Sequence, residues 1–542
     1  MGPVTRHPAS GVAAAPRRFR WRPAYLPYLA AAGLSVLYAL GNLHFLQQHL
    51  DWDQVDYSRH IESSLAGEAV RYHPHHLHLD VGGKHFHRVM VQHLGHAGFT
   101  DLVFNNRLRA LLTACVGLTL VLLLLTRVTG SLGWGLTGAL LVAVLHGYLL
   151  YATKVDTAIY TVVALLAVLF LAERLARVRR GALAVAALLG LAMFLAVMSH
   201  QMLAIACVVT CLVFALPAAL FSGRPLLAVF DVRRPVEAQI ERSARTRWLA
   251  TVGMALLGVA LIAAAYFYVG RVVYRLSFDR PNPAEARGPY TKADPKLTFQ
   301  RWMFHYAVLG GWGKGIGRFD PLRTAWGWTS AFVSQASLTP RMLKPDTGLA
   351  ADLTRPASPT GFVQNQLAYF ALAVSGLSLL LLGGLLRRHG RFGLVLVGNL
   401  VAFTLAAVYW EPHYVEFWIP PSVLLVLLAV LVFDHLARLA RPLVGRALEV
   451  PLKAYVLALA TLFLVHNSVW FLVPYSRVEQ LEDLNPAWSR DYSLGLFSRA
   501  IYRHPGNVYQ TVYGTRPGEA HPGVPRPTNK WWQRAEAAAK GR

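Results

Sequence analysis

Long apolar runs separated by short charged segments form the dominant hydrophobic pattern of this chain. A run of roughly 20 apolar residues is the length that crosses about 30 Å of hydrocarbon as an α-helix. The runs cover residues 24–45, 110–125, 134–150, 158–172, 182–198, 202–221, 249–269, 367–386, 393–408, 419–433 and 455–471. The pattern predicts an all-α polytopic membrane protein with about 11 transmembrane helices.

Basic residues gather in alternate connecting segments, and this distribution predicts an orientation. They precede the first run and recur at 173–180, 224–247, 387–391 and 438–446. Because short cytoplasmic loops are enriched in Lys and Arg, we expect residues 1–23 to form a cytoplasmic N-terminus. Residues 24–473 then form the transmembrane domain, with long outer loops at 46–107 and 271–365. Residues 474–542 follow as an extracytoplasmic tail.

Composition narrows the class of protein. Hydrophobic residues make up 55% and charged residues 15% of the 542 residues, which disfavours a set of soluble domains. A net charge of +25 ordinarily suggests nucleic acid. Here the basic residues lie mainly in linkers between runs, so topology explains much of the excess and we expect no nucleic-acid partner. Bias toward Ala, Leu, Arg and Gly favours a bacterial source, hence a multi-pass protein of the bacterial plasma membrane.

The three cysteines give no sign of redox or metal chemistry. Cys115, Cys207 and Cys211 all fall inside apolar runs, and the sequence has no Cys-x-x-Cys pair. A cysteine in such a run is usually a small apolar core residue. We therefore expect neither a disulfide nor a cysteine-bound metal.

Three aspartates stand just beyond the first apolar run, at Asp51, Asp53 and Asp56. A single aspartate there is most simply a solvated helix end, but three so close together, beside Trp52 and Tyr57, favour a functional group. If the backbone is helical, Asp53 and Asp56 are spaced i, i+3 and share a face. They can then act together in acid–base chemistry or hold one divalent cation, Mg²⁺ or Mn²⁺. No other cofactor is expected.

A histidine-rich stretch follows in the same loop, Tyr72-His73-Pro74-His75-His76-Leu77-His78. Neutral imidazoles are common zinc ligands. Alternation over so short a loop gives poor control of ligand geometry, however, and no helical His-x-x-x-His motif with an intervening Glu is present. We expect these histidines to contact an anionic phosphate or to orient loop backbone. The glycine-rich segment 311–317 resembles a phosphate loop in composition only, because it lacks Gly-Lys-Ser/Thr and a preceding strand.

Further ionisable residues stand at the predicted outer ends of later runs. They are Lys154, Asp156, His200, Glu411, His413 and Glu416. Ionisable groups near membrane depth are costly and tend to be paired or functional. Each one alone is best explained as an interfacial anchor, whereas the group predicts a shared polar cavity that opens outward.

Several of these segments together resemble the GT-C class of membrane glycosyltransferases, in particular bacterial relatives of the protein O-mannosyltransferases. The similar segments are Asp53 with Asp56-Tyr57, Tyr72 to Leu77, Asn105-Asn106-Arg107, Asp156 with Ile159-Tyr160, and Glu416-Phe417-Trp418-Ile419-Pro420. They cover about the first 200 residues and the segment 410–420. The first loop lacks the adjacent Asp-Glu pair of the O-mannosyltransferases, which leaves the identity of the base and of the acceptor open.

The resemblance implies a reaction in which a sugar leaves a polyprenyl phosphate with inversion and passes to an extracytoplasmic glycan, lipid or protein. Asp53 is the first choice for the general base, with Asp56 as its partner or as a metal ligand. General-base catalysis contributes roughly 10² to 10⁴ in rate. The predicted substrate-binding residues, which include donors for the leaving phosphate, are Tyr57, His73, His75, His76, Lys154, Asp156, His200, Glu411, His413 and Glu416.

Two other classes of protein fit the same pattern. A transporter or flippase of a lipid-linked glycan needs the same membrane architecture, although no internal repeat is evident, as those folds commonly have. A non-catalytic membrane assembly protein can use the histidine-rich loop to bind a metal or a partner. Dependence on one loop aspartate distinguishes the transferase from both.

Overall fold

The computed structural model describes residues 25–44, 57–58, 60–61, 64–65, 76–97, 102–177, 181–216, 238–278, 298–304, 319–334, 359–409, 412 and 415–472. Within these ranges the regular structure is helical, with no β-strand. Six of the predicted site residues lie outside the described residues: Asp53, Asp56, His73, His75, Glu411 and His413.

Nine helices of the described residues are long and apolar enough to cross a membrane. They are α1 (Leu26–His44), α4 (Leu102–Thr129), α7 (Ala158–Arg177), α8 (Ala182–Ser199), α10 (Ala238–Phe267), α15 (Pro359–Leu380), α16 (Leu382–Tyr409), α17 (Val415–Val444) and α18 (Glu449–Asn467). A tenth span results if α5 (Leu132–Ala143) and α6 (His146–Ala152), bent by 70° at their junction, cross together. The remaining predicted run, at 202–221, contains the shorter apolar helix α9 (Ala204–Ala215).

Each predicted run therefore overlaps at least one helix, although the run at 134–150 is divided between α5 and α6 and the run at 367–386 continues from α15 into α16. The polytopic all-α class is confirmed. Several helices extend beyond the runs at their polar ends. The run at 419–433, for example, is part of a helix that spans Val415–Val444. This is expected, because a helix can continue past the hydrocarbon into the headgroup region once its backbone hydrogen bonds are made internally.

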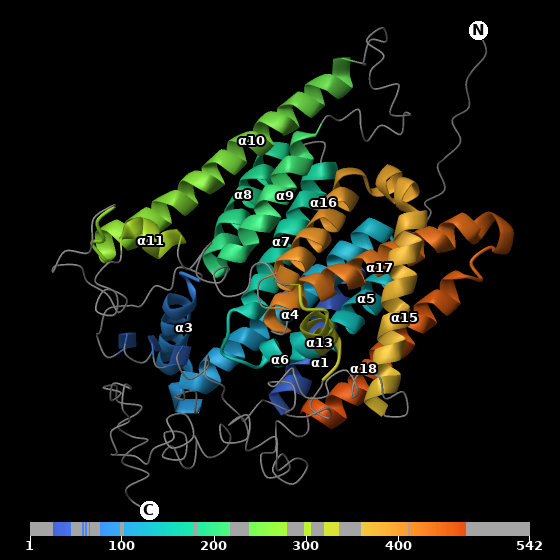
Figure 1. The fold of residues 1–542 in the computed structure, drawn as a ribbon, viewed down its shortest axis with the longest axis horizontal. Helices are drawn as coiled ribbons and strands as arrows, with labels where there is room; N and C mark the ends of the chain where they lie inside the picture. The colour runs from blue at the N-terminus through green and yellow to red at the C-terminus, as the bar shows by residue number, and fades with distance from the viewer. Residues whose placement is uncertain are drawn as a thin grey trace, which may run out of the picture.

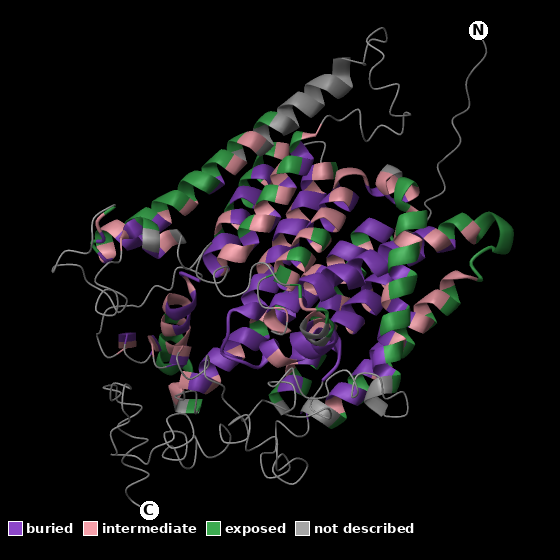
Figure 2. Ribbon diagram, viewed as in Figure 1, coloured by how far each residue is buried: buried purple, intermediate pink, exposed green. Residues whose placement is uncertain are grey.

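Helix α17 lies at the centre of the bundle (Figure 1). Of the residues in its apolar membrane-spanning part, 89% are buried, compared with 22% for the span that contains α10 and 17% for α1. Figure 2 shows the same division, with buried residues in the middle and exposed residues on α10 and α15. The exposed positions of the outer helices include Leu256, Leu372 and Leu379. A contiguous apolar surface of this kind suits lipid contact.

The break between α5 and α6 is held by hydrogen bonds from distant parts of the chain. Asn467, at the end of α18, donates from Nδ2 to the carbonyls of Val144 (2.7 Å) and Phe332 (3.1 Å). Its Oδ1 accepts from the Ser334 backbone N–H at 2.7 Å. Phe332 ends the short helix α13 (Pro321–Phe332). A single buried amide thus joins α18, α13 and the broken span.

Segments of the two predicted outer loops pack together at one end of the bundle. The first loop contains α3 (Leu79–Leu94) followed by the short turn η2 (Gly95–Ala97), and the second contains α11 (Phe299–Phe304). An apolar cluster joins Leu77 of the first loop, Met198 of α8, Tyr274 after the π-helical turn η6 (Tyr268–Val273), and Trp302 of α11. The ends of these elements therefore surround one region, which we call the histidine end because His76, His78 and His200 lie there.

Candidate active site

Arg109 links three elements at the histidine end. Its Nε donates to the Tyr160 hydroxyl at 2.7 Å, and its Nη1 donates to the Leu79 carbonyl at 3.1 Å. The guanidinium also lies over the Tyr160 ring, 4.8 Å from the ring centroid. Arg109 is buried, and its planar fork suits several simultaneous contacts of this kind. It fixes α3 against α4 and α7.

His78, just before α3, attaches the first loop to the end of α8. Its Nδ1 lies 3.0 Å from the Met198 carbonyl. A carbonyl can only accept, so Nδ1 carries the proton of this hydrogen bond. The ring packs edge-on against Tyr160, with centroids 5.7 Å apart. Burial lowers the pKa of His78 to about 4, which keeps the imidazole neutral at pH 7.

Tyr57 and His76 bring two separated parts of the first loop together. The Tyr57 hydroxyl and His76 Nε2 are 2.9 Å apart, and the two rings meet edge-on with centroids 5.1 Å apart. Tyr57 directly follows Asp56 in the sequence, and His76 directly follows His75. The contact therefore joins Tyr57, which follows the predicted aspartate pair, to His76, which is itself one of the predicted phosphate-binding histidines.

Asp156 and Lys154 form a buried pair before α7. Lys154 Nζ lies 2.8 Å from Asp156 Oδ2, and the side chains are 6% and 2% exposed. Asp156 Oδ1 accepts from the backbone N–H groups of Thr157 at 2.5 Å and Ala158 at 3.3 Å. A carboxylate in this position caps the helix, and it interacts favourably with the partial positive charge at the helix N-terminus. The pair therefore anchors the start of α7, and its predicted role in substrate binding stays a prediction.

His200 and Glu416 meet at a small hollow next to the same helix start. Thr157, Thr161, His200 and Glu416 are among its lining residues, and its volume of about 10 Å³ is near the minimum that holds one water molecule. His200 Nδ1 accepts from the Met202 N–H at 3.1 Å, and burial lowers the pKa of His200 to about 4. The prediction that these outer ends converge agrees with this arrangement of α7, the α8–α9 turn and α17.

The described part of the chain offers no additional ligands for the predicted divalent cation. There, no group of three or more His, Cys, Asp or Glu side chains is placed to hold a metal ion. His60 Nδ1 and Asp80 Oδ2 are 3.9 Å apart, but two such side chains alone do not make a ligand cage. The predicted cation ligands Asp53 and Asp56 lie outside the described residues, so their metal role stays a prediction.

Sequence reasoning missed Arg109. Its signal was a single basic residue between Leu108 and Ala110 at the entry to a long apolar run, where an ionisable group is costly unless paired. Among the described residues, its Nη2 has no hydrogen-bond partner although it is buried. The histidine end therefore holds two buried cations that differ in their partners. Lys154 is paired with Asp156, whereas Arg109 has one nitrogen, Nη2, that is not used by the described residues.

These features define a class: a polytopic, all-helical membrane protein with a polar, histidine-rich site where the ends of several helices and two loops meet. No protein-family model and no curated protein matches the chain. Several solved structures resemble it loosely. One is the apo oligosaccharyltransferase of Archaeoglobus fulgidus, at 16% identity and a TM-score of 0.43, with 84% of this chain and 56% of that chain covered.

Two other similar structures contain a polyprenyl phosphate. The archaeal oligosaccharyltransferase AglB from Archaeoglobus fulgidus, with an inhibitory peptide and a dolichol-phosphate, is 14% identical at a TM-score of 0.44, with 84% of this chain and 56% of that chain covered. ArnT from Cupriavidus metallidurans, bound to undecaprenyl phosphate, is 14% identical at a TM-score of 0.45, with 90% and 78% covered. The chain thus spans just over half the length of the archaeal protein. Likenesses of this strength assign neither a family nor a reaction to this chain.

Proposed function

We propose that this protein is a membrane glycosyltransferase that moves a sugar from a polyprenyl phosphate to an acceptor on the outer side of the bacterial plasma membrane. One observation supports this more than any other. Tyr57, which follows the predicted aspartate pair, is in contact with His76 of the histidine run, and His78 contacts α8 and α7. The described parts of the first loop on either side of these contacts therefore lie against the helix ends that carry the other polar groups, which supports the proposal.

In the proposed reaction, an acceptor hydroxyl attacks the anomeric carbon of the donor. Asp53 takes the hydroxyl proton, the bond from the anomeric carbon to the phosphate oxygen breaks, and the configuration inverts. Asp56 orients Asp53 or shares a divalent cation with it. We infer this assignment from the sequence motif, and a carboxylate base needs only to reach the hydroxyl at hydrogen-bond distance.

The leaving polyprenyl phosphate needs positive charge or hydrogen-bond donors held in place. His73, His75 and His76 are the proposed donors from the first loop. Arg109 is a further candidate, because it is permanently charged and buried, and its Nη2 has no partner among the described residues. His78 is fixed as a neutral donor to a carbonyl, so in this scheme it positions the loop and does not bind the anion.

The broken span α5–α6 is a feature that transporters also show, where unwound backbone binds the transported ion. Here the freed Val144 carbonyl accepts a hydrogen bond from Asn467, and His146 Nδ1 lies 2.6 Å from the Ser330 carbonyl. The break is thus closed by protein groups. This favours a structural break over an ion site and makes translocation the weaker alternative.

The test compares a deletion strain that expresses wild type, Asp53→Asn or Asp56→Asn. Asp51→Asn is the matched control, because it removes a carboxylate from the same loop at a position to which we assign no role. Mass spectrometry measures envelope glycans and the polyprenyl-phosphate sugar pool, and immunoblots measure the amount of each variant in the membrane. We expect loss of one sugar, accumulation of its lipid-linked donor, and rescue by wild type and Asp51→Asn only.

Full rescue by both Asp53→Asn and Asp56→Asn would remove the catalytic assignment. Normal glycans in the deletion strain itself would overturn the transferase proposal and bring the assembly-protein alternative forward. Accumulation of the donor on the inner leaflet with no aspartate dependence would indicate a flippase.

A further inference from the structure

A second polar site lies at the opposite end of the bundle from the candidate active site. The helices α4, α7 and α17 begin at the histidine end, and their last turns carry Arg127, Arg177 and Arg441. We call this the basic end. Since α4 has 28 residues and rises about 1.5 Å per residue, the two ends are roughly 40 Å apart. Any site at the basic end is therefore separate from the sugar-transfer site.

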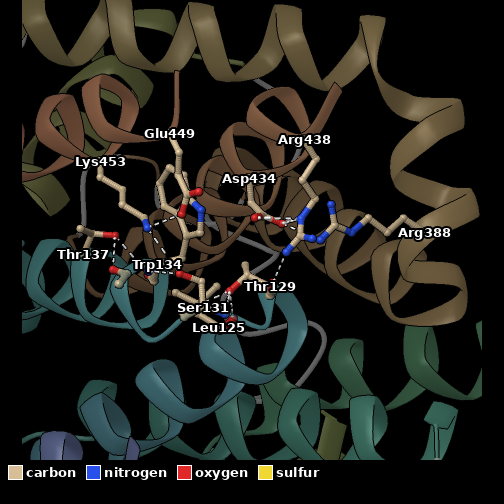
Figure 3. A network of polar contacts seen from close by, with 11 residues as sticks. Leu125, Thr129, Ser131, Trp134, Thr137, Arg388, Asp434, Arg438, Glu449 and Lys453 are labelled. Atoms are coloured by element: carbon tan, nitrogen blue, oxygen red, sulfur yellow. Dashed lines mark hydrogen bonds and ion pairs between the residues drawn. The ribbon is translucent and has the colours of Figure 1, made fainter. Parts of the chain in front are cut away.

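A cavity of about 270 Å³ opens at the basic end, near the lower limit of small-molecule pockets at roughly 300 Å³. It lies between the start of α5, the end of α17 and the start of α18. Its polar lining consists of Ser131, Asp434, Arg438, Arg441, Arg446 and Glu449. Figure 3 shows part of this wall, with Arg388 and Arg438 both reaching Asp434, and Glu449 beside Lys453.

The carboxylates of the wall are already neutralised. Asp434 Oδ2 lies 2.7 Å from Arg388 Nη2 and 3.1 Å from Arg438 Nε. Glu449 Oε1 lies 2.5 Å from Lys453 Nζ. Arg438 also donates to the Thr129 carbonyl. These pairs use Arg388, Arg438 and Lys453, and among the described residues the other two arginines of the cavity make no ion pair within 4 Å.

Arg441 and Arg446 are those other two arginines. Neither has an ion pair to a carboxylate among the described residues, and both are exposed. They lie on the two sides of Gly445, whose φ of +61° ends α17 in a left-handed turn that suits glycine. The turn brings both arginines to one cavity, and its geometry would be strained by any residue with a Cβ.

The start of α5 adds a favourable electrostatic feature on the opposite wall. Gly130 and Ser131 line the cavity, and Ser131 caps the 12-residue helix by accepting from the Trp134 N–H. The N-terminal end of a helix carries partial positive charge and favours anions. The positive-inside rule explains why arginines occur at this end, but it does not require two arginines outside the ion pairs described above and a helix start to surround one cavity.

We propose that this cavity binds the phosphate group of an anionic phospholipid from the leaflet at the basic end. Arginine recognises phosphate through paired, charge-assisted hydrogen bonds. Exposed apolar side chains next to the arginines favour a lipid over a free phosphate ion: Leu439 is 53% exposed, Leu443 is 87% exposed and Val444 is 50% exposed. These residues lie on the same last turns of α17 as Arg441 and offer apolar surface for acyl chains near the cavity. The proposal does not depend on the sugar-transfer reaction.

The test is native mass spectrometry of the full chain in detergent, titrated with phosphatidylglycerol or phosphatidylcholine, for wild type, Arg441→Gln and Arg446→Gln. Arg174→Gln is the matched control, since Arg174 lies in the last turn of α7 at the same end but does not line the cavity. A basic side chain near a lipid headgroup contributes about 1 kcal/mol, so each cavity variant should bind phosphatidylglycerol about fivefold more weakly. The control should bind like wild type.

Equal weakening by Arg174→Gln would mean that only the overall charge of this end matters, and would overturn the proposed site. So would equal binding of both lipids by wild type. Arg441→Lys guards against misfolding, because it keeps the charge and should retain most of the binding. Inorganic phosphate is the second arm: if it protects the protein in a thermal-shift assay and phosphatidylglycerol is not retained, the lipid assignment is wrong.

Discussion

Two histidines of the candidate active site are held neutral by their surroundings, and this has a measurable consequence. His78 donates from Nδ1 to a carbonyl, and His200 accepts at Nδ1 from a backbone N–H. Burial lowers the pKa of each to about 4. Protonation of His200 would cost it the hydrogen bond that it accepts. His78 keeps its Nδ1 donor when it is protonated, so burial, and not the loss of this hydrogen bond, opposes its protonation.

We predict that the protein loses stability as the pH falls from about 6.5 toward 4. The unfolded histidines titrate near 6.5 and the folded ones near 4, so the unfolded state binds more protons throughout this interval. Stability is complete above the unfolded pKa and falls by up to about 1.4 kcal/mol per pH unit for each histidine. Thermal unfolding of the purified protein in detergent between pH 7.5 and 4.5 measures it.

The matched variants for this prediction are His78→Asn and His93→Asn. Asparagine at 78 keeps an N–H donor near the Met198 carbonyl and cannot titrate, so the pH dependence should become shallower. His93 lies exposed on α3, and its replacement should leave the pH dependence unchanged. An identical slope for wild type and His78→Asn would show that His78 does not contribute.

At the scale of elements, the apolar pattern predicted the helices because each membrane-spanning helix needs a long apolar run, and this signal is local in sequence. It could not predict the break between α5 and α6. The partner that closes the break is Asn467, which is 323 residues from Val144. Similarly, α3 was not predicted, because its polar and histidine-rich sequence has the composition of a loop. Its helix is stabilised by tertiary contacts such as that of Arg109 with the Leu79 carbonyl.

We predict that Asn467→Leu destabilises the protein strongly. The change leaves the Val144 and Phe332 carbonyls and the Ser334 N–H buried without this partner, and each unsatisfied buried group costs about 1–3 kcal/mol. A total loss of roughly 3 kcal/mol or more should appear as a lower melting temperature and a lower amount in the membrane. Fluorescence-detected size-exclusion chromatography after heating measures both.

Asn399→Leu is the control for that change. Asn399 is also fully buried, but its Nδ2 donates only to the Val395 carbonyl of its own helix, which remains bonded within the helix without it. We expect a loss of about 1 kcal/mol or less. If Asn467→Leu were no less stable than Asn399→Leu, the amide would not be what holds the broken span.

Across the whole molecule, charge separates the two ends of the bundle. The sequence predicted that Asp156, His200 and Glu416 share one end, because each stands where an apolar run meets a predicted outer segment. The structure brings Thr157, His200 and Glu416 to one hollow. The contacts of Arg109 could not be predicted from the sequence. They join residues of three helices whose separations along the chain follow no helical or strand periodicity. The roles of Asp53 and Asp56 remain predictions from the motif.

The orientation of the bundle decides whether the proposed chemistry is extracytoplasmic, and single-cysteine labelling tests it. In a background with Cys115, Cys207 and Cys211 replaced by alanine, His85→Cys on α3 reports the histidine end and Leu443→Cys reports the basic end; both sites are exposed. Short basic loops stay in the cytoplasm. A membrane-impermeant maleimide should therefore label His85→Cys in intact spheroplasts and Leu443→Cys only after permeabilisation. The reverse result would place the candidate active site in the cytoplasm, where an acceptor and donor of the inner leaflet would have to replace those proposed above.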